Sequence, residues 1–202
     1  WHFDDKVAQK YLLEAIDAPL VPSYVFYEKE EALKWAKTTS YPKVFKLKGG
    51  AGSSNVVLIK NVNRCLQVIN RAFDKGISQY NPKNDFKDKW RKFKETKNPM
   101  HVFKGIARFF IAPSFARLQY REKGYVYFQE FIPNNETDTR VIVIKNKAFA
   151  IKRGVREGDF SASVSGKIIY DEKLINIESI KTSFEINNLI KSQCIAFDYI
   201  FL

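Results

Sequence analysis

Polar and apolar positions follow two periods along the chain. Apolar residues that recur every three or four positions predict amphipathic helices, whereas alternation in steps of two predicts strands half buried in a sheet. The helical period covers residues 8–16, 30–39, 62–73 and 177–191. The strand pattern covers residues 23–27, 43–48, 56–59, 125–131, 139–144, 148–153 and 195–202. The chain therefore mixes helices and strands along its length.

Short polar signals mark where several of these elements begin and end. Asp4 and Asp5 precede the first helix, where acidic side chains favour the positive end of the helix dipole. Gly76 follows the third predicted helix, a position typical of a helix end. Asn146 lies between two strand patterns and predicts a hairpin turn.

Residues 76–124, called the basic segment below, differ in composition from the rest of the chain. Twelve lysines and arginines stand against four acidic residues, a net charge of +8 out of +12 for the whole chain. Residues 101–120 are basic and aromatic at helical spacing, with Pro113 as a break. We interpret the segment as an insertion, either a solvated helical pair or a docking surface for an anionic membrane or a polyanionic acceptor.

Composition narrows the class of protein without choosing a partner. A length of 202 residues suits one domain or two small ones, and the charge of +12 permits nucleic acid, an anionic membrane or phosphate-bearing small molecules. Cys65 and Cys194 lie in apolar patterns, which predicts two reduced, buried thiols and a reducing compartment. His2 and His101 lack metal-ligand spacing. Because Trp1 is no initiator methionine, we expect an excised part of a larger protein.

A glycine- and serine-rich loop joins two predicted strands and carries the strongest chemical signal. The strand Lys43–Lys48 leads into Gly49–Ser54, and a second strand covers Val56–Ile59. Backbone N–H groups in such a loop can lie against an anion, and Lys46 supplies a nearby charge. This pattern favours a cover over nucleotide phosphates. It is not a Walker A loop, since no Lys-Ser/Thr pair closes it, and a hairpin without a ligand is the alternative.

Other candidate residues follow in chain order, and each has a structural alternative. Lys6 and Lys46 could be ordinary solvated lysines, and Glu130 an edge-strand charge. Arg140 could pair with Asp138 in a surface salt bridge. Asp198 is different, because a carboxylate in an apolar strand must be paired or bound to a metal.

Taken together, these motifs resemble the ATP-grasp superfamily, in particular the RimK-type branch that contains ribosomal-protein glutamate ligases. The resemblance covers nearly the whole chain except the basic segment. The motifs that carry it are PKVFKLKGGAGSSNVVLIK, YVYFQEFIPNNETDTRVIVI, IKRGVREGDF and CIAFDYI. It implies an α+β fold in which two subdomains with antiparallel sheets grip ATP. Here these are residues 1–124, including the basic segment, and a truncated second subdomain of residues 125–202.

The resemblance also implies a role for each matching residue. Lys6 and Lys46 would hold the phosphates, Asp138 would lie near the ribose, and Asp198 would be the first Mg²⁺ ligand. Arg140 and Arg153 would be catalytic. The covering loop would include Gly49, Gly50, Gly52, Ser53 and Ser54, and the adenine cradle would be Glu130, Phe131 and Ile132.

The implied reaction uses ATP and Mg²⁺ to join a carboxylate to an amine or a similar nucleophile. The carboxylate attacks the γ-phosphate to form an acylphosphate, and the amine then displaces phosphate. The resemblance further implies a bacterial, cytoplasmic ligase like those of surface-polysaccharide gene clusters. The two substrates, sugar- or peptide-linked, stay unidentified, because the fold does not fix them.

Two departures from the family pattern bear on activity. Ser161 stands where relatives carry an arginine, and a serine cannot provide a bidentate cationic group. The chain also stops at Leu202, before the Glu and Asn that complete the metal site in relatives. We therefore expect a fragment that binds nucleotide and metal weakly without turnover. A degenerate nucleotide-binding or scaffold module is the alternative, and a nucleic-acid partner has only the basic segment in its favour.

Overall fold

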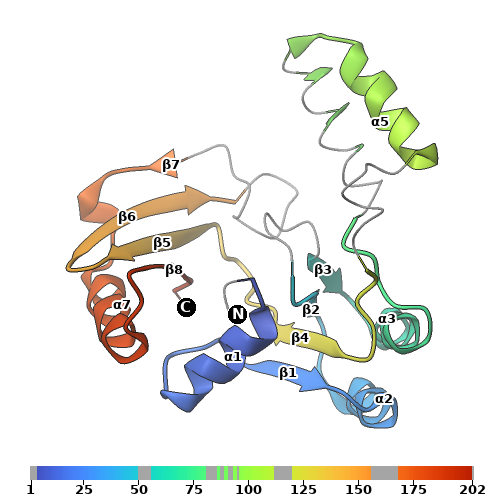
Figure 1. Ribbon diagram of the computed structural model, residues 1–202, viewed down its shortest axis with the longest axis horizontal. Helices are drawn as coiled ribbons and strands as arrows, with labels where there is room; N and C mark the ends of the chain where they lie inside the picture. The colour runs from blue at the N-terminus through green and yellow to red at the C-terminus, as the bar shows by residue number, and fades with distance from the viewer. Residues whose placement is uncertain are drawn as a thin grey trace. The chain divides into compact units, whose positions relative to one another are not determined.

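The computed structural model describes residues 4–49, 56–80, 86, 89–90, 93–94, 96–111, 120–155 and 168–201 (Figure 1). The chain forms two compact units. The first comprises Trp1–Val7 and Pro22–Glu130, and the second comprises Ala8–Val21 and Phe131–Leu202. Helix α1 (Lys6–Ala15) begins in the first unit and continues in the second. Its first turn is capped by Asp5, whose carboxylate accepts a hydrogen bond from the Val7 amide at 3.0 Å.

The first unit is built on a four-stranded antiparallel sheet. Its strands, in the order β1-β4-β2-β3, are β1 (Ser23–Phe26), β4 (Val126–Glu130), β2 (Lys43–Lys46) and β3 (Val56–Ile59). Helices α2 (Lys29–Thr38) and α3 (Val62–Asp74) accompany it. Asn61 caps α3 through a bond from the Arg64 amide at 3.0 Å.

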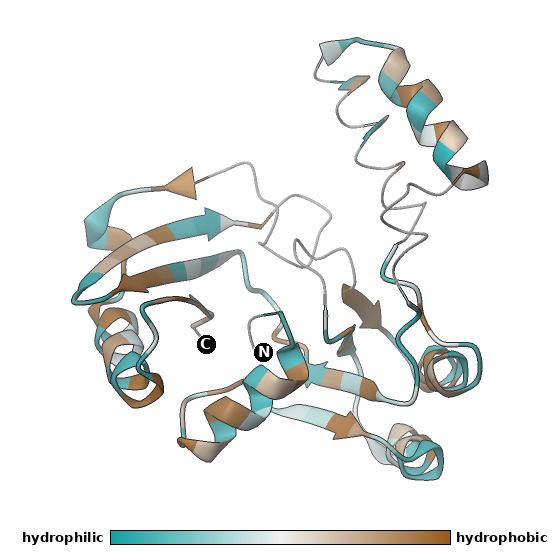
Figure 2. Cartoon of the chain, viewed as in Figure 1, coloured by the Kyte–Doolittle hydropathy of each residue, from teal (hydrophilic) through white to brown (hydrophobic). Residues whose placement is uncertain are grey.

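The two faces of this sheet differ because side chains alternate along each strand. One face packs against α2 and α3 and contains Phe45, Ile59 and Phe128 with Ala32 and Ile69. β3 is apolar along its length (Figure 2). The other face carries a smaller cluster of Val7, Val25, Tyr125 and Tyr127. Lys46 lies opposite Tyr127 in the β2–β4 register, so it belongs to this second, more polar face.

The ends of the basic segment meet beside α3. Ile77 and Glu122 form an antiparallel bridge with backbone hydrogen bonds of 2.8 and 2.9 Å. Gly76 and Gly124 flank this bridge at φ angles of +70° and +83°, which side chains rarely adopt. Within the segment, helix α5 spans Met100–Phe110.

The second unit has its own antiparallel sheet in the order β7-β6-β5-β8. The strands are β7 (Ile168–Ile169), β6 (Lys147–Gly154), β5 (Thr137–Ile144) and β8 (Cys194–Tyr199). A 3₁₀ turn, η1 (Glu172–Leu174), leads to helix α7 (Ile177–Ile190). Helix α7 contacts β5 and β8 and buries the small side chains of Ser179 and Ser183. The Ser183 and Tyr199 hydroxyls are 2.8 Å apart.

The α+β class and the antiparallel sheets predicted from the sequence are confirmed. The expected division between residues 124 and 125 differs from the observed one. β4 pairs with β1 and β2 and therefore lies in the first unit, and residues 8–21 group with the second. The burial predicted for Cys65 is confirmed, whereas Cys194 is exposed, because it opens the outer strand β8. Among the described residues, no helix has the length and apolar character needed to cross a bilayer.

Candidate functional site

The first turn of α1 is tied to the start of the glycine loop. The Lys6 amide donates a hydrogen bond to the Lys48 carbonyl at 2.9 Å, and Lys6 Nζ lies 3.4 Å from the same oxygen. Burial lowers the pKa of the Lys6 ammonium below its ordinary value, although the carboxylates of Asp4, Glu122 and Asp5 oppose this shift. A bound anion would offset that burial. The structure thus places Lys6 next to Lys48, directly before the loop that was predicted to cover phosphates.

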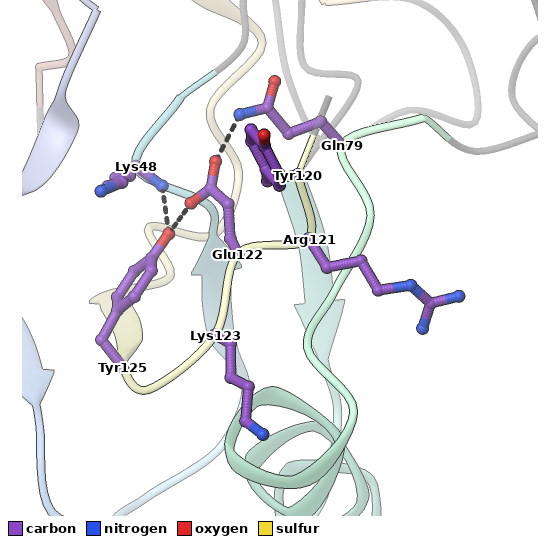
Figure 3. A pocket seen from close by; sticks show the side chains of 7 residues that line it. All are labelled: Lys48, Gln79, Tyr120, Arg121, Glu122, Lys123 and Tyr125. Carbon is purple, nitrogen blue, oxygen red and sulfur yellow. Dashed lines mark hydrogen bonds between the residues drawn. The ribbon is translucent and has the colours of Figure 1, made fainter. Parts of the chain in front are cut away.

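Beside this junction lies a pocket of about 400 Å³ at the base of the basic segment (Figure 3). Glu122 is at its centre and accepts hydrogen bonds from the Gln79 side-chain amide and from the Tyr125 hydroxyl. The same hydroxyl accepts a bond of 2.7 Å from the Lys48 amide. Burial raises the pKa of the Tyr125 hydroxyl, and the bond to Glu122 raises it further. The full lining is Lys48, Gln79, Tyr120, Arg121, Glu122, Lys123 and Tyr125.

Gly49 is buried against this network. A Cβ atom at position 49 would lie 2.7 Å from the Gln79 side-chain nitrogen and 3.3 Å from a Glu122 carboxylate oxygen. Because Gln79 is held by Glu122, any larger residue at position 49 must displace both side chains. Sequence reasoning assigned Gly49 to the loop but did not identify Glu122, Tyr125 or Gln79. In the sequence, the only feature that pointed to these three residues was their position near Gly76 and Gly124, the glycines that bound the basic segment.

Lys46 lies on the polar face of the first sheet. Its ammonium group donates to the Gln129 side-chain carbonyl at 2.5 Å, and the Gln129 amide donates to the Ser23 hydroxyl at 3.2 Å. Lys46 and Lys48 are two positions apart. Because side chains alternate between the two faces of an extended chain, both lysines are on the face opposite the apolar core. Lys46 therefore lies on the face where α1 begins.

Glu130 uses its side chain inside the first unit. Its carboxylate accepts bonds of 2.6 and 2.7 Å from Lys43 and of 3.0 Å from the Tyr24 hydroxyl. Lys43, whose side chain is only 1% exposed, is its direct partner in the β2–β4 register. A buried lysine requires such a carboxylate, a role the sequence did not reveal. The adenine-binding role of Glu130, Phe131 and Ile132 stays a prediction.

Four charged residues form a network on the second sheet. Arg140 donates two hydrogen bonds of 2.7 Å to Asp198, and Arg153 donates bonds of 2.7 and 2.6 Å to Asp138. Arg153 also lies 3.0 Å from Asp198 and links the two pairs. In each bidentate pair, the arginine and the aspartate are directly opposite each other on neighbouring strands.

The alternative in which Arg140 pairs with Asp138 is therefore not the observed arrangement, since Arg140 pairs with Asp198. Burial raises the pKa of the Asp198 carboxyl, but hydrogen bonds and charge from Arg140 and Arg153 outweigh it and leave that pKa below the ordinary value. Arg140 and Arg153 hold their predicted strand positions, and their catalytic role, like the ribose role of Asp138, stays a prediction.

In this arrangement both Asp198 oxygens accept hydrogen bonds from guanidinium groups. The role of Asp198 as the first Mg²⁺ ligand stays a prediction. The described residues also contain no group of three or more His, Cys, Asp or Glu side chains that could hold a metal ion. The ion pairs of this network offset the free-energy cost of placing the Asp198 carboxylate in an apolar strand.

Part of the predicted site lies outside the described residues. Gly50, Gly52, Ser53 and Ser54 of the loop belong to this part, and so does Ser161. The described candidates fall into two sets. Lys6, Lys46, Gly49 and Glu130 are in the first unit. The second unit contains Phe131, Ile132, Asp138, Arg140, Arg153 and Asp198.

Two antiparallel sheets with accompanying helices, in this chain order, define the ATP-grasp fold, and the chain has this fold. Residues 5–97 match the family model for the ATP-binding domain of the carbamoyl-phosphate synthase L chain. A comparison of the sequence with curated proteins gives no match.

Solved structures of ATP-grasp ligases are similar to the chain in fold. The ATP-grasp ligase PsnB, in complex with a minimal precursor, is 16% identical with a TM-score of 0.52, over 97% of this chain and 47% of that protein. D-alanine–D-alanine ligase from Bacillus anthracis is 13% identical with a TM-score of 0.55, over 98% and 52%. N5-carboxyaminoimidazole synthetase from Staphylococcus aureus, in complex with ADP, is 14% identical with a TM-score of 0.59, over 99% and 41%. The chain thus spans about half the length of these proteins or less.

Proposed function

We propose that the chain is the nucleotide-binding part of an ATP-dependent ligase that joins a carboxylate to an amine or similar nucleophile. The observation that carries this proposal is the pair of contacts from Lys6 to the Lys48 carbonyl, directly before Gly49 and two residues after Lys46 at the end of β2. The ATP-grasp ligase fold of the similar structures supports it, and one of these proteins holds ADP.

In this proposal the lysines bind the phosphates of ATP. Lys6 is partly buried and gains from a nearby anion, because the anion restores the charge stabilisation lost on burial. Lys46 would leave its bond with Gln129 for a phosphate oxygen, a stronger charge-assisted partner. The proposal assigns the phosphates to these lysines, and the Asp198 carboxylate is paired with two arginines in this structure.

The proposed reaction needs positioning and charge stabilisation more than covalent chemistry by the protein. A substrate carboxylate oxygen attacks the γ-phosphorus of ATP, the bond to the β-phosphate oxygen breaks, and ADP leaves. The amine nitrogen then attacks the acyl carbon, and phosphate leaves with the formation of an amide. Membership of the RimK-type branch and a cytoplasmic, bacterial setting belong to this proposal. The identity of the two substrates lies beyond it.

Calorimetric titration of ADP and of a non-hydrolysable ATP analogue tests the nucleotide site. Lys46→Ala should weaken binding at least about tenfold, since a charged hydrogen bond is lost. Lys60→Ala, which removes an exposed lysine at the far end of β3, is the matched control and should bind as the wild type does. Equal binding by Lys46→Ala and the wild type would remove Lys46 from the site.

A second function is favoured by one observation. Because Asp198 is neutralised by Arg140 and Arg153, the chain could bind nucleotide as a scaffold without ligation. Hydroxylamine traps an acylphosphate as a hydroxamate, with release of phosphate, and so separates the two functions. Hydroxamate formed from ATP and a pool of carboxylic acids supports the ligase. Nucleotide binding without hydroxamate from any acid in the pool supports the scaffold.

A further inference from the structure

Helix α5 has apolar residues on two sides, and in the part of the chain that the structure describes one side is packed while the other is exposed. Its inner side faces other helical residues of the basic segment. Gly105 is buried, and a Cβ atom there would lie 2.9 Å from the ring of Phe86. Phe86, Trp90 and Phe93 form a row of aromatic contacts, with ring centroids 6.1 and 5.7 Å apart. The Phe86 ring at one end of this row therefore packs against the side of α5 that carries Gly105.

The outer side of α5 exposes a line of large apolar side chains. Met100, Phe103 and Ile106 recur every three residues and are 53%, 69% and 48% exposed. Ile111, directly after the helix, is 58% exposed. Single exposed apolar residues are common on protein surfaces, but a helix that is apolar on both sides is normally buried. The helix appears as alternating brown and teal bands in Figure 2.

The charges described on helix α5 and before it are positive. Helix α5 contains no acidic residue, and its exposed Lys104 directly follows Phe103. Lys94 and Lys97, in the described stretch before the helix, are exposed and also basic. An occupant of this side must therefore offer both apolar atoms and negative charge. A polyanion alone would leave Phe103 and Ile106 in water, whereas an anionic bilayer offers both features.

We propose that the outer side of α5 docks on an anionic membrane surface. Phe103, Ile106 and Met100 enter the boundary between headgroups and acyl chains, and Lys104 lies at the level of the lipid phosphates. This contact is independent of the nucleotide site, because none of these residues belongs to it. The basic segment would then bring an ATP-grasp unit to a membrane-associated acceptor.

Vesicle co-sedimentation of the full chain tests the proposal. One set of vesicles is phosphatidylcholine alone, and the other contains phosphatidylglycerol as well. The variant Phe103→Ser/Ile106→Ser removes the apolar contact, and Tyr170→Ser/Leu174→Ser, at two exposed sites of the second unit, is the matched control. The contribution of charge to vesicle binding is tested by comparing Lys104→Gln with Lys147→Gln, since both lysines are exposed. Circular dichroism and thermal unfolding verify that each variant is folded.

We expect binding to the vesicles with phosphatidylglycerol and little binding to phosphatidylcholine alone. The Phe103→Ser/Ile106→Ser variant should lose at least about tenfold in binding, and Lys104→Gln about fivefold, while both control variants bind as the wild type does. Equal binding to neutral vesicles would overturn the proposal, and so would unchanged binding by a folded Phe103→Ser/Ile106→Ser variant. Absence of vesicle binding, with a dimer in light scattering that this variant abolishes, would assign the side to a second copy of the chain.

Discussion

At the scale of single residues, strand register decides which charged groups meet. Asp138 and Arg140 are two positions apart on β5, where side chains of one face are about 7 Å apart along the strand. Directly opposite residues of neighbouring strands lie closer, at about 5 Å. Arg140 therefore pairs with Asp198 and Asp138 with Arg153, each its partner in the ladder. The sequence displays the four residues but not the register, so these pairs could not be predicted from it.

The Asp198 network predicts a pH-dependent contribution to stability. The folded-state pKa of Asp198 lies below its ordinary value of 3.8, so the contribution is present above that value and is lost as the pH falls through the folded-state pKa. Asp198→Asn should lower the free energy of unfolding by about 1 kcal/mol at neutral pH, a modest value because the carboxylate is partly exposed and screened.

Urea unfolding of both proteins, at neutral pH and below pH 3.8, measures this difference. The gap between wild type and Asp198→Asn should shrink in acid. Glu178→Gln, which removes an exposed pair with Lys181, is the control and should change little at either pH. A gap that stays constant in acid would show that Asp198 acts through packing and not through its charge.

Lys6 predicts a pH dependence of nucleotide binding, which rests on the proposed function. Its pKa is lowered from 10.5 in the folded chain, so the ammonium loses its proton earlier than a solvated lysine does. Affinity for ADP should therefore fall as the pH rises through this lowered pKa. Lys6→Arg should keep its affinity over the same range, because a guanidinium stays charged. Parallel curves for wild type and Lys6→Arg would exclude Lys6 as the titrating group.

At the scale of elements, the bridge between Ile77 and Glu122 depends on the two glycines that flank it. Alanine at position 76 would be strained at φ +70°, and its Cβ would lie 3.0 Å from the Arg121 Cβ and 3.1 Å from the Glu122 carbonyl oxygen. Gly76→Ala should lower the free energy of unfolding by about 2 kcal/mol. Chemical denaturation followed by tryptophan fluorescence measures it.

Gly124→Ala provides the matched comparison. Its φ of +83° is equally unfavourable, but a Cβ there meets nothing within 4 Å. Gly124→Ala should lower the free energy of unfolding by about 1 kcal/mol, because only the backbone strain at positive φ contributes. If Gly76→Ala and Gly124→Ala lower the free energy of unfolding equally, crowding at position 76 has no energetic effect.

Most elements could be predicted from the sequence, because the two hydrophobic periods are local properties. Strand β3 and helix α7 lie within a residue or two of their predicted ranges. The assignment of β4 to a subdomain could not be predicted, since it depends on pairing with β1 and β2, which lie far away in sequence. The candidate site follows the same rule. Lys6 and Lys46 had recognisable contexts, whereas Glu122 and Tyr125 gain their roles only where the ends of the basic segment meet.

At the scale of the whole molecule, the net charge of +12 acts at long range. It attracts an anionic nucleotide before contact, but beyond about 8 Å this attraction is screened at physiological salt. Rising salt should therefore lower the association rate of ADP and leave the dissociation rate nearly unchanged. Stopped-flow measurement with a fluorescent ADP analogue separates the two rates. A salt effect confined to dissociation would show that local ion pairs dominate.

The bridge at the base of the basic segment has a consequence for the modularity of the chain. The Gly124 amide bonds to the Ala72 carbonyl at 3.2 Å, so the chain leaves and rejoins the first unit at one place. Segments with adjacent ends can be excised or exchanged with little effect on the host, because the remaining gap is short and closes at low entropic cost. A chain in which a short turn connects α3 to β4 should keep the first sheet. The basic segment is therefore an exchangeable insertion. A different segment, with a different binding surface, can be joined to the first unit at the same two adjacent ends.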